Sequence, residues 1–471
     1  MNKQNFLYQT LVSDLMQQIK NGTYKIGEKL PSIRALHKKL GVSISTVYKT
    51  YIELESMGVV EARPKSGYFV KPGPLLNPPA IVKTLPVIRE INFSSIVIAV
   101  LKDLNNPDMI QLGSSTTSHE LLPVKQLTRI TRAVNAQKMK SLISYSMADG
   151  NPGMKRQLAR LFMGTMGNTA RHDIIITSGC MEAVTISLMA LAEKNDTILI
   201  ESPAHFGFLK LLKELGLNIV EAPVDPITGI DLNQFEKIVK SEKITACLVM
   251  SNFQNPTGAL MPEGNKKEFV KTAAEYNVPV IEDNILSELY YGKTRPSSLK
   301  KYDIWDNVIS CSSFSKTIAP GLRIGWLAAP EKYRKKILSI KSGISISSSN
   351  LNQYIITEFL KSGAYDRFMR TLRNKLRKQI FKVAQAVKKY FPEETRVSMP
   401  EGGSLLWIQL PCDVNGIELY KTARKKQISI IPGQVCSGSG KFKNYIRLGC
   451  GSLFDKNMEQ GIKTLGKSMG I

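Results

Sequence analysis

The chain has 471 residues, 43% of them hydrophobic, and a formal net charge of +25, so two or three domains with sizeable cores are expected and a polyanion is the first partner to consider. It contains no apolar run of about 18 residues and no signal peptide, which predicts a cytoplasmic protein without membrane contact. Six scattered cysteines without a C-x-x-C pair indicate reduced thiols, and four histidines without zinc-ligand spacing predict no metal site.

The first seventy residues have the pattern of three helices followed by a two-stranded ribbon. Leu11, Leu15 and Ile19 recur at helical spacing, and Asn21-Gly22 ends that helix. Ser32 can cap a second helix. In chain order we expect helices over 8–20, over 33–40 and from Ser43 or Ser45 to about Met57, then strands over 58–63 and 67–70. This order is the α+β plan of a winged helix-turn-helix.

Several motifs in this segment resemble the DNA-binding domain of the GntR family: G-x-Y-x-x-G-E-K-L-P-S-I-R, L-G-V-S-x-S-T-V-Y-K-T-Y, L-E-S-M-G and S-G-Y-F-V. The resemblance implies that this domain binds a double-stranded DNA operator. The implied contacts are Arg34, Ser43, Ser45, Thr46, Tyr48 and Lys49, with Arg63, Lys65 and Gly67 in the wing. Ile44 departs from the pattern, since many relatives have an arginine there. One base contact is then missing, or becomes an apolar contact to a thymine methyl group.

A proline-rich stretch separates this domain from the rest of the chain. Pro72, Pro74, Pro78 and Pro79 predict a semi-rigid, extended linker. We expect a winged helix-turn-helix domain over 1–71, a linker over 72–91 and a second domain over 92–471, which opens with a short apolar helix over 94–104.

Strand-like and helical runs alternate from about residue 110. The strand-like runs are 174–176, 198–200, 246–250, 278–281 and 307–311. This alternation predicts an α/β domain with a mainly parallel sheet, whose ligands bind beyond the carboxyl ends of the strands.

A polar turn after the 307–311 strand presents Lys316 within S-S-F-S-K, followed by G-L-R-I-G-W with Arg323. A lysine made nucleophilic at neutral pH can form a Schiff base with an aldehyde. The hydroxyls of Ser313 and Ser315 and the Arg323 guanidinium suit a phosphate monoester. Together these groups predict a site for pyridoxal 5′-phosphate (PLP). Small residues at 177–180, where a helix opens, predict an anion site from free N–H groups.

These segments resemble the fold-type I PLP-dependent transferases, which have a large and a small subdomain. The resemblance implies a site in which Lys316 carries PLP and the Asp283 carboxylate pairs with the pyridine nitrogen, with Glu282 as the less favoured alternative. Further implied cofactor contacts are Gly179, Cys180 and Met181 at the phosphate, His205 stacked on the ring unless it is an ordinary loop histidine, Asn255 of N-P-T-G at O3′, and Tyr145 reaching across a homodimer. Arg447 is the implied clamp for the carboxylate of an amino acid.

The sequence departs from this family where a second tyrosine partner of O3′ is usual, since it has Ile285 and Leu286 there. The departure leaves PLP binding intact but indicates weak transamination. A helix over 366–378 has a dense basic face, which is a solvated surface or a secondary DNA track.

The order of GntR-type reader, linker and aminotransferase-like body resembles the MocR (GabR/PdxR-like) subfamily. The leading hypothesis is a PLP-dependent transcription regulator that senses PLP, an amino acid or another amine. The alternatives are a working aminotransferase and a pure dimerisation scaffold. Retention of Lys316, Asn255, Asp283, Arg323 and Arg447 argues against the scaffold.

Overall fold

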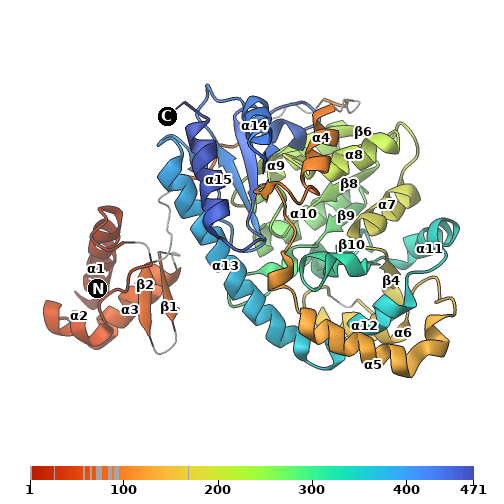
Figure 1. The fold of residues 1–471 in the computed structure, drawn as a ribbon, viewed down its shortest axis with the longest axis horizontal. Helices are drawn as coiled ribbons and strands as arrows, with labels where there is room; N and C mark the ends of the chain where they lie inside the picture. Colours follow the sequence, from red (N-terminus) through yellow and green to blue (C-terminus); the bar gives the residue numbers. More distant parts are fainter. Residues whose placement is uncertain are drawn as a thin grey trace. The chain divides into compact units, whose positions relative to one another are not determined.

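A computed structural model describes residues 3–25, 27–56, 59–63, 66–70, 77–82, 87–89, 95–167 and 169–470 (Figure 1). The chain divides into two compact units, residues 1–78 and 79–471. In the described parts of the chain, no helix is both long and apolar enough to cross a bilayer.

The first unit is a winged helix-turn-helix, as the sequence predicts. Its elements are α1 (Lys3–Lys20), α2 (Ile33–Leu40), α3 (Ile44–Ser56), β1 (Val60–Arg63) and β2 (Gly67–Val70), the last two antiparallel. Ser32 begins α2 by accepting a hydrogen bond from the Ala35 N–H at 3.1 Å. Gly41 ends α2 in the left-handed conformation, with φ of 66°.

One small core holds the three helices of this unit together. Leu15, Leu36, Val47 and Leu54 are buried in it. Tyr51 packs among them, stacks on the ring of Tyr68 in the wing, and donates a hydrogen bond to the Pro31 carbonyl at 2.6 Å. The buried residues of α3 lie at positions 47, 50, 51 and 54, so they form one face of this helix and the opposite face is turned outward.

The second unit is built on a mixed sheet of eight strands in the order β4-β11-β10-β9-β8-β5-β6-β7. Strands β10, β9, β8, β5 and β6 are parallel, while β11 and β7 are antiparallel to their neighbours. The bounds are β4 (Ile174–Thr177), β5 (Thr197–Ser202), β6 (Asn218–Asp225), β7 (Gly229–Ile230), β8 (Ala246–Val249), β9 (Val280–Asp283), β10 (Val308–Ser313) and β11 (Gly325–Ala328). The mainly parallel α/β sheet predicted from the sequence is confirmed.

Helices cover both faces of this sheet and create two apolar cores (Figure 1). One face carries α7 (Cys180–Leu191), which packs on β9, β10 and β11, together with α8 (Phe206–Glu214) and α11 (Glu331–Ser345). The other face carries α9 (Leu232–Ser241) and α10 (Glu263–Glu275). Neighbouring residues of a strand point to opposite faces, and accordingly Ile198 lies in one core and Leu199 in the other.

A smaller subdomain contains the C-terminal elements and the residues that follow the first unit. Its sheet has the order β12-β13-β16-β15. The elements are α4 (Ser95–Asp103), β3 (Ile110–Gln111), β12 (Arg396–Val397), β13 (Leu405–Gln409), α14 (Gly416–Lys425), β14 (Ile428–Ser429), β15 (Ile431–Pro432), β16 (Tyr445–Gly449) and α15 (Lys456–Lys467). Three other helices are α5 (Val124–Leu142), α6 (Pro152–Leu161) and α12 (Asn350–Lys361), and the long α13 (Ala364–Tyr390) packs on both α12 and α15.

The predicted linker over 72–91 lies partly outside the described residues. Its described residues after Pro78 belong to the second unit: the Ala80 N–H donates to Oε1 of Gln409 at 2.9 Å, and Arg89 forms a backbone bridge with Ile219. The domain boundaries at 71 and 91 therefore stay predictions, while the compact units divide at residue 78.

Candidate functional site

Lys316 lies where strand β10 ends, in the short helical turn η5 (Phe314–Lys316). Its Nζ donates a hydrogen bond to the Ser115 hydroxyl at 3.0 Å, and its carbonyl accepts one from Thr117 Oγ1 at 2.9 Å. Burial, and then the positive charge of Arg447, lower the pKa of Lys316 to about 8. A substantial fraction of this amine is therefore neutral and nucleophilic near physiological pH.

Asp283 ends the neighbouring strand β9. Its Oδ1 accepts hydrogen bonds from the Ile285 N–H at 2.9 Å and from the Cys180 thiol at 3.2 Å. Burial raises the pKa of Asp283 to about 6, while these two hydrogen bonds hold it down. The group is therefore a carboxylate at neutral pH, and it can hold a proton on a nearby ring nitrogen.

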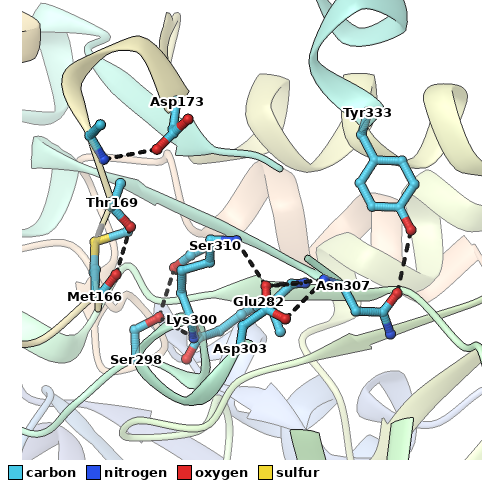
Figure 2. A network of polar contacts seen from close by, with 12 residues as sticks. Met166, Thr169, Asp173, Glu282, Ser298, Lys300, Asp303, Asn307, Ser310 and Tyr333 are labelled. Atoms are coloured by element: carbon cyan, nitrogen blue, oxygen red, sulfur yellow. Dashed lines mark hydrogen bonds and ion pairs between the residues drawn. The ribbon is translucent and has the colours of Figure 1, made fainter. Parts of the chain in front are cut away.

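Glu282, the less favoured alternative, has a different environment from Asp283. Figure 2 shows its carboxylate within a buried polar network that includes Ser298 and Ser310. It also accepts hydrogen bonds from Ser251 Oγ at 2.5 Å and the Leu299 N–H at 2.9 Å. Adjacent strand residues point to opposite faces, so Glu282 stabilises the loops behind the sheet and leaves Asp283 as the candidate.

A cradle for an anion forms where β4 ends and α7 begins. Gly179, with φ of 102°, precedes the first turn of α7, and a Cβ there would lie 2.4 Å from Nη2 of Arg323. Only glycine lets the guanidinium approach so closely. Arg323 donates to the Ser178 carbonyl at 2.9 Å, and its Nη1 lies 3.4 Å from the Ser315 hydroxyl. A guanidinium, a hydroxyl and the free N–H groups of a helix N-terminus together suit a phosphate.

The other three residues predicted around the phosphate differ in their surroundings. Ser313 is buried and its hydroxyl accepts from the Ser315 N–H at 3.2 Å, which fixes the turn that carries Lys316. Met181 lies in the first turn of α7 with an exposed side chain. Tyr145 is 84% exposed in the described chain, so its predicted role across a dimer stays a prediction.

Arg447, on strand β16, is a fully buried guanidinium. Its Nη1 donates to Oδ1 of Asn255 at 2.9 Å and its Nη2 to the Gly113 carbonyl at 2.7 Å. Nε is buried and has no hydrogen-bond partner among the described residues. Burial lowers the pKa of Arg447 to about 10, so the group stays cationic at neutral pH. A buried cation with an unsatisfied donor is suited to an anionic ligand.

His205 lies directly before α8, and its Nδ1 accepts a hydrogen bond from the Gly207 N–H at 2.9 Å. The ring stacks on Phe206, with 5.0 Å between centroids. Burial, followed by the charges of Arg447 and Lys316, lowers the pKa of His205 to about 3. The imidazole is therefore neutral beside the two cations, and a neutral flat ring is suited to stacking.

The structure also adds a site residue that sequence reasoning missed. Ser115, which holds the Lys316 amine, follows the short strand β3 and lies 201 residues from the lysine along the chain. No local motif marks it. At the position where a tyrosine partner of O3′ is usual, the side chain of Leu286 is buried and apolar.

The outward face of the first unit begins with the cap of α3. The Ser43 hydroxyl accepts from the Thr46 N–H at 3.1 Å and lies 2.8 Å from the hydroxyls of both Ser45 and Thr46. Arg34 and Tyr48 are exposed. Hydroxyls and N–H groups at a helix N-terminus suit DNA phosphates.

Two cations predicted to meet DNA already have contacts within this unit. The Lys49 ammonium lies over the Tyr8 ring, 4.2 Å from its centroid. Arg63 pairs with Glu61 at 2.9 Å and lies over the Phe69 ring at 3.9 Å. Gly67 has φ of 106° in the wing. Lys65 lies outside the described residues.

The predicted basic helix is part of α13. Arg373 turns inward: its Nε donates to the Glu288 carbonyl at 2.7 Å and its guanidinium lies over the Tyr290 ring at 3.8 Å. Of the other cations in the 366–378 segment, those at 367, 370, 375 and 378 are exposed and Arg377 is half-buried. Whether they form a solvated face or a DNA track stays a prediction.

Comparisons with known proteins agree with both units. Residues 7–70 match the family model of bacterial regulatory proteins of the gntR family, and residues 107–465 match that of aminotransferase class I and II. The HTH-type transcriptional regulator YjiR of Escherichia coli K12, itself uncharacterised, is 32% identical over 98% of both chains. The chain belongs to the MocR subfamily of GntR regulators.

Two further proteins are similar to this chain, one in sequence and one in fold. The HTH-type transcriptional regulator NorG of Staphylococcus aureus is 26% identical over 88% of this chain and 93% of its own. The α-aminoadipate aminotransferase LysN of Thermus thermophilus, solved with N-(5′-phosphopyridoxyl)-L-leucine, shares the fold with a TM-score of 0.74 at 24% identity, over 80% of this chain and 94% of that one. The fold-type I architecture predicted from the sequence is confirmed.

Class I and II aminotransferases depend on PLP, and the pocket of this MocR protein fits that cofactor. Lys316 supplies an amine of lowered pKa, and Asp283 supplies a buried carboxylate. Gly179 leaves space beside the Arg323 guanidinium, and the Cβ of any larger residue at this position would fill that space. The buried, unsatisfied Nε of Arg447 requires an acceptor that the described protein atoms do not supply.

Proposed function

We propose that this chain is a transcription regulator that binds duplex DNA through its winged helix and senses an amino acid or a related amine in its PLP pocket. The observation that carries the proposal is that the half-buried Lys316 amine lies within electrostatic reach of the buried Arg447 guanidinium, in a chain that also carries a DNA-binding unit. The charge of Arg447 helps to lower the pKa of Lys316, so the groups for an aldehyde and for a carboxylate are electrostatically coupled.

Different residues of this chain would bind different parts of the cofactor. Bound PLP supplies an aldehyde and an electron-accepting ring. Lys316 would offer a neutral amine to the aldehyde, and Asp283 would hold the proton on the ring nitrogen. Arg323, the serines of the turn and the α7 N-terminus would hold the phosphate, and His205 would stack on the ring.

The effector in this proposal is an amino acid with a free carboxylate. Arg447 is fixed by Asn255 and Gly113 through two of its nitrogens, which leaves Nε to an incoming carboxylate. Because Nη1 contacts Asn255, the predicted O3′ partner, a bound carboxylate would shift the hydrogen bonds of the cofactor contact as well. This coupling supports sensing of the ligand and cofactor together.

The DNA-binding part of the proposal rests on the GntR fold of residues 7–70. We further propose that the regulator is a homodimer in which Tyr145, highly exposed in the single chain, reaches the neighbouring site.

A second candidate is a working aminotransferase. It is favoured by the retention of Lys316, Asp283 and Arg447 with the geometry given above. Leu286 is apolar and lies where a tyrosine hydroxyl is usually the second partner of O3′, which favours the sensor.

One experiment separates the two candidates. The PLP-loaded protein is titrated with a panel of amino acids while its absorbance and its affinity for DNA are measured in parallel. The regulator predicts one amine that changes both the spectrum and the DNA affinity. Rapid multiple turnover without any change in DNA binding would favour the enzyme.

A further inference from the structure

The third helix of the first unit presents apolar side chains to solvent where a DNA reader is expected to be polar. Ile44 and Tyr48, one turn apart on α3, are 51% and 53% exposed. We call this pair the apolar strip. It is not needed for the core, because Val47, Tyr51 and Leu54 on the same helix already fill it.

Single exposed apolar residues are ordinary on protein surfaces. The surroundings of this pair are unusual because they contain hydroxyl groups and no nearby acidic residue of the first turns of α2 and α3. Beside the strip lie the linked hydroxyls of Ser43, Ser45 and Thr46. Neither α2 nor α3 has an acidic residue in its first turn. The acidic residues of α3, Glu53 and Glu55, come near its C-terminal end.

The N-terminal half of α3 is therefore complementary to a polyanion. Helix N-termini favour negative charge, Arg34 is exposed on α2, and residues 1–72 carry a net charge of +6. A positively charged surface of this kind would first contact the phosphates of DNA, which would bring the apolar pair on α3 to the groove. Within the major groove, the apolar strip would then contact the edges of the bases.

We propose that Ile44 and Tyr48 read thymine methyl groups in the major groove of the operator. The thymine C5-methyl is the one apolar group that the major-groove base edges present. Residues four apart on a helix are about 6 Å apart along its axis. This is close to two base steps of about 3.4 Å, so we infer two thymines that are roughly two steps apart. The inference rests on the proposed DNA binding and adds the sequence chemistry of the operator.

The same helix supplies a matched control. Ile52 is 41% exposed, one turn beyond Tyr48, but it is flanked by Glu53. Phosphates are disfavoured near that carboxylate, so Ile52 should lie outside the reading surface.

The test begins with the full-length protein and a pool of random-sequence duplexes, from which the tightest binders are enriched. In one enriched duplex, each thymine is replaced in turn by uracil, which removes only the methyl group. At one or two positions we expect affinity to fall about fourfold, the equivalent of losing one buried apolar carbon. Ile44→Ala or Tyr48→Ala should abolish the thymine-to-uracil difference at its own position, while Ile52→Ala should keep it.

A second variant tests the same contact by gain of function. Ile44→Arg should shift the enriched sequences at that position from thymine to guanine, the base that arginine recognises best. Thermal melting of each variant checks that the unit stays folded, which its exposed position predicts.

The outcomes separate the inference from the function on which it rests. Enriched duplexes that bind equally well with thymine and uracil would overturn the strip as a methyl reader and leave DNA binding standing. A change of oligomeric state in Ile44→Ala, with the thymine preference intact, would assign the strip to a contact between copies and overturn the inference. A protein that enriches no duplex would overturn the proposed function and the inference together.

Discussion

The thiol of Cys180 donates a hydrogen bond to Oδ1 of Asp283 over 3.2 Å. Helix α7 thus begins against the carboxylate that ends strand β9. The same helix turn supplies backbone N–H groups for an anion, so one residue connects the phosphate end and the ring-nitrogen end of the predicted PLP pocket. The carboxylate is buried, and each hydrogen bond to its charged form opposes the effect of burial on its pKa.

Replacing Cys180 by alanine should therefore raise the pKa of Asp283 above its value of about 6. A higher pKa leaves less carboxylate at neutral pH and weakens its pairing with a protonated ring nitrogen. A thiol is a weak donor, so we expect about fivefold weaker PLP binding at pH 7. PLP titrations at a series of pH values measure both effects.

Cys180→Ser keeps a donor and should restore most of the affinity. Cys247→Ala, at a buried thiol in the other core of the sheet, should leave the pH dependence unchanged. If both alanine variants shift it equally, the thiol does not act through Asp283.

Lys316→Ala should abolish covalent capture of PLP, as detected by borohydride reduction and peptide mapping. In the unchanged protein, the rate of capture should rise with pH and level off above about 8. Below that pH the amine of Lys316 is protonated, and only the neutral amine attacks an aldehyde.

Another buried lysine with a lowered pKa, Lys341, provides the control. Lys341→Met should not change the capture of PLP. A capture profile with its midpoint at the ordinary lysine pKa of 10.5 would contradict the assignment to Lys316.

Arg447→Gln should weaken binding of an amino acid about a hundredfold, because a buried charged contact to the carboxylate is lost. It should also move the pH midpoint of PLP capture upward, since the charge of Arg447 helps to lower the pKa of Lys316. Loss of stability alone would not shift that midpoint. Arg334→Gln, at a partly exposed ion pair with Asp173, is the matched control and should change neither quantity.

The sequence predicted the fold well because buried parallel strands appear as continuous apolar runs. The helix bounds Ile33–Leu40 and the cap at Ser32 followed from local rules. What it could not predict are contacts between distant parts of the chain. Ser115 meets the Lys316 amine from 201 residues away, and no local pattern marks such a serine.

Side-chain direction was the second limit. Cys180 was selected for its backbone at a helix start, and the partner of its thiol is 103 residues away. Nothing in the sequence indicates that the ammonium of Lys49, whose contact with DNA stays a prediction, lies over Tyr8 of α1. Both strand faces are buried at Glu282 and Asp283, so burial alone could not separate them. The hydrogen-bond partners of Glu282 did.

DNA binding should weaken steeply with salt, because several phosphate contacts release counterions. Arg34→Ala should weaken binding on all duplexes and lower the salt slope by about one, whereas Arg34→Lys should keep most of the slope. Fluorescence anisotropy between low and physiological salt measures this. Affinity that is the same at both salt concentrations would contradict a phosphate-binding role for this unit.

Turnover of an amino acid in this pocket should be slow. In the proposed function Arg447 would let an amino acid dock beside Lys316, but the apolar Leu286 would offer no hydroxyl to the cofactor oxygen O3′. Without that donor the cofactor is less well tuned for proton abstraction, so a bound amino acid should persist. We expect pyridoxamine phosphate to form slowly compared with the roughly 1–10³ s⁻¹ of ordinary enzymes.

Leu286→Tyr should speed this step if the missing hydroxyl limits it, while Leu289→Met, at a nearby buried apolar site, should not. Pyridoxamine phosphate and DNA affinity are measured in the same samples. In the unchanged protein, the amino acid that persists longest in the pocket should be the one that changes DNA affinity, because a ligand shifts an equilibrium only while it is bound. A fast-consumed amino acid with the largest effect on DNA would contradict this link.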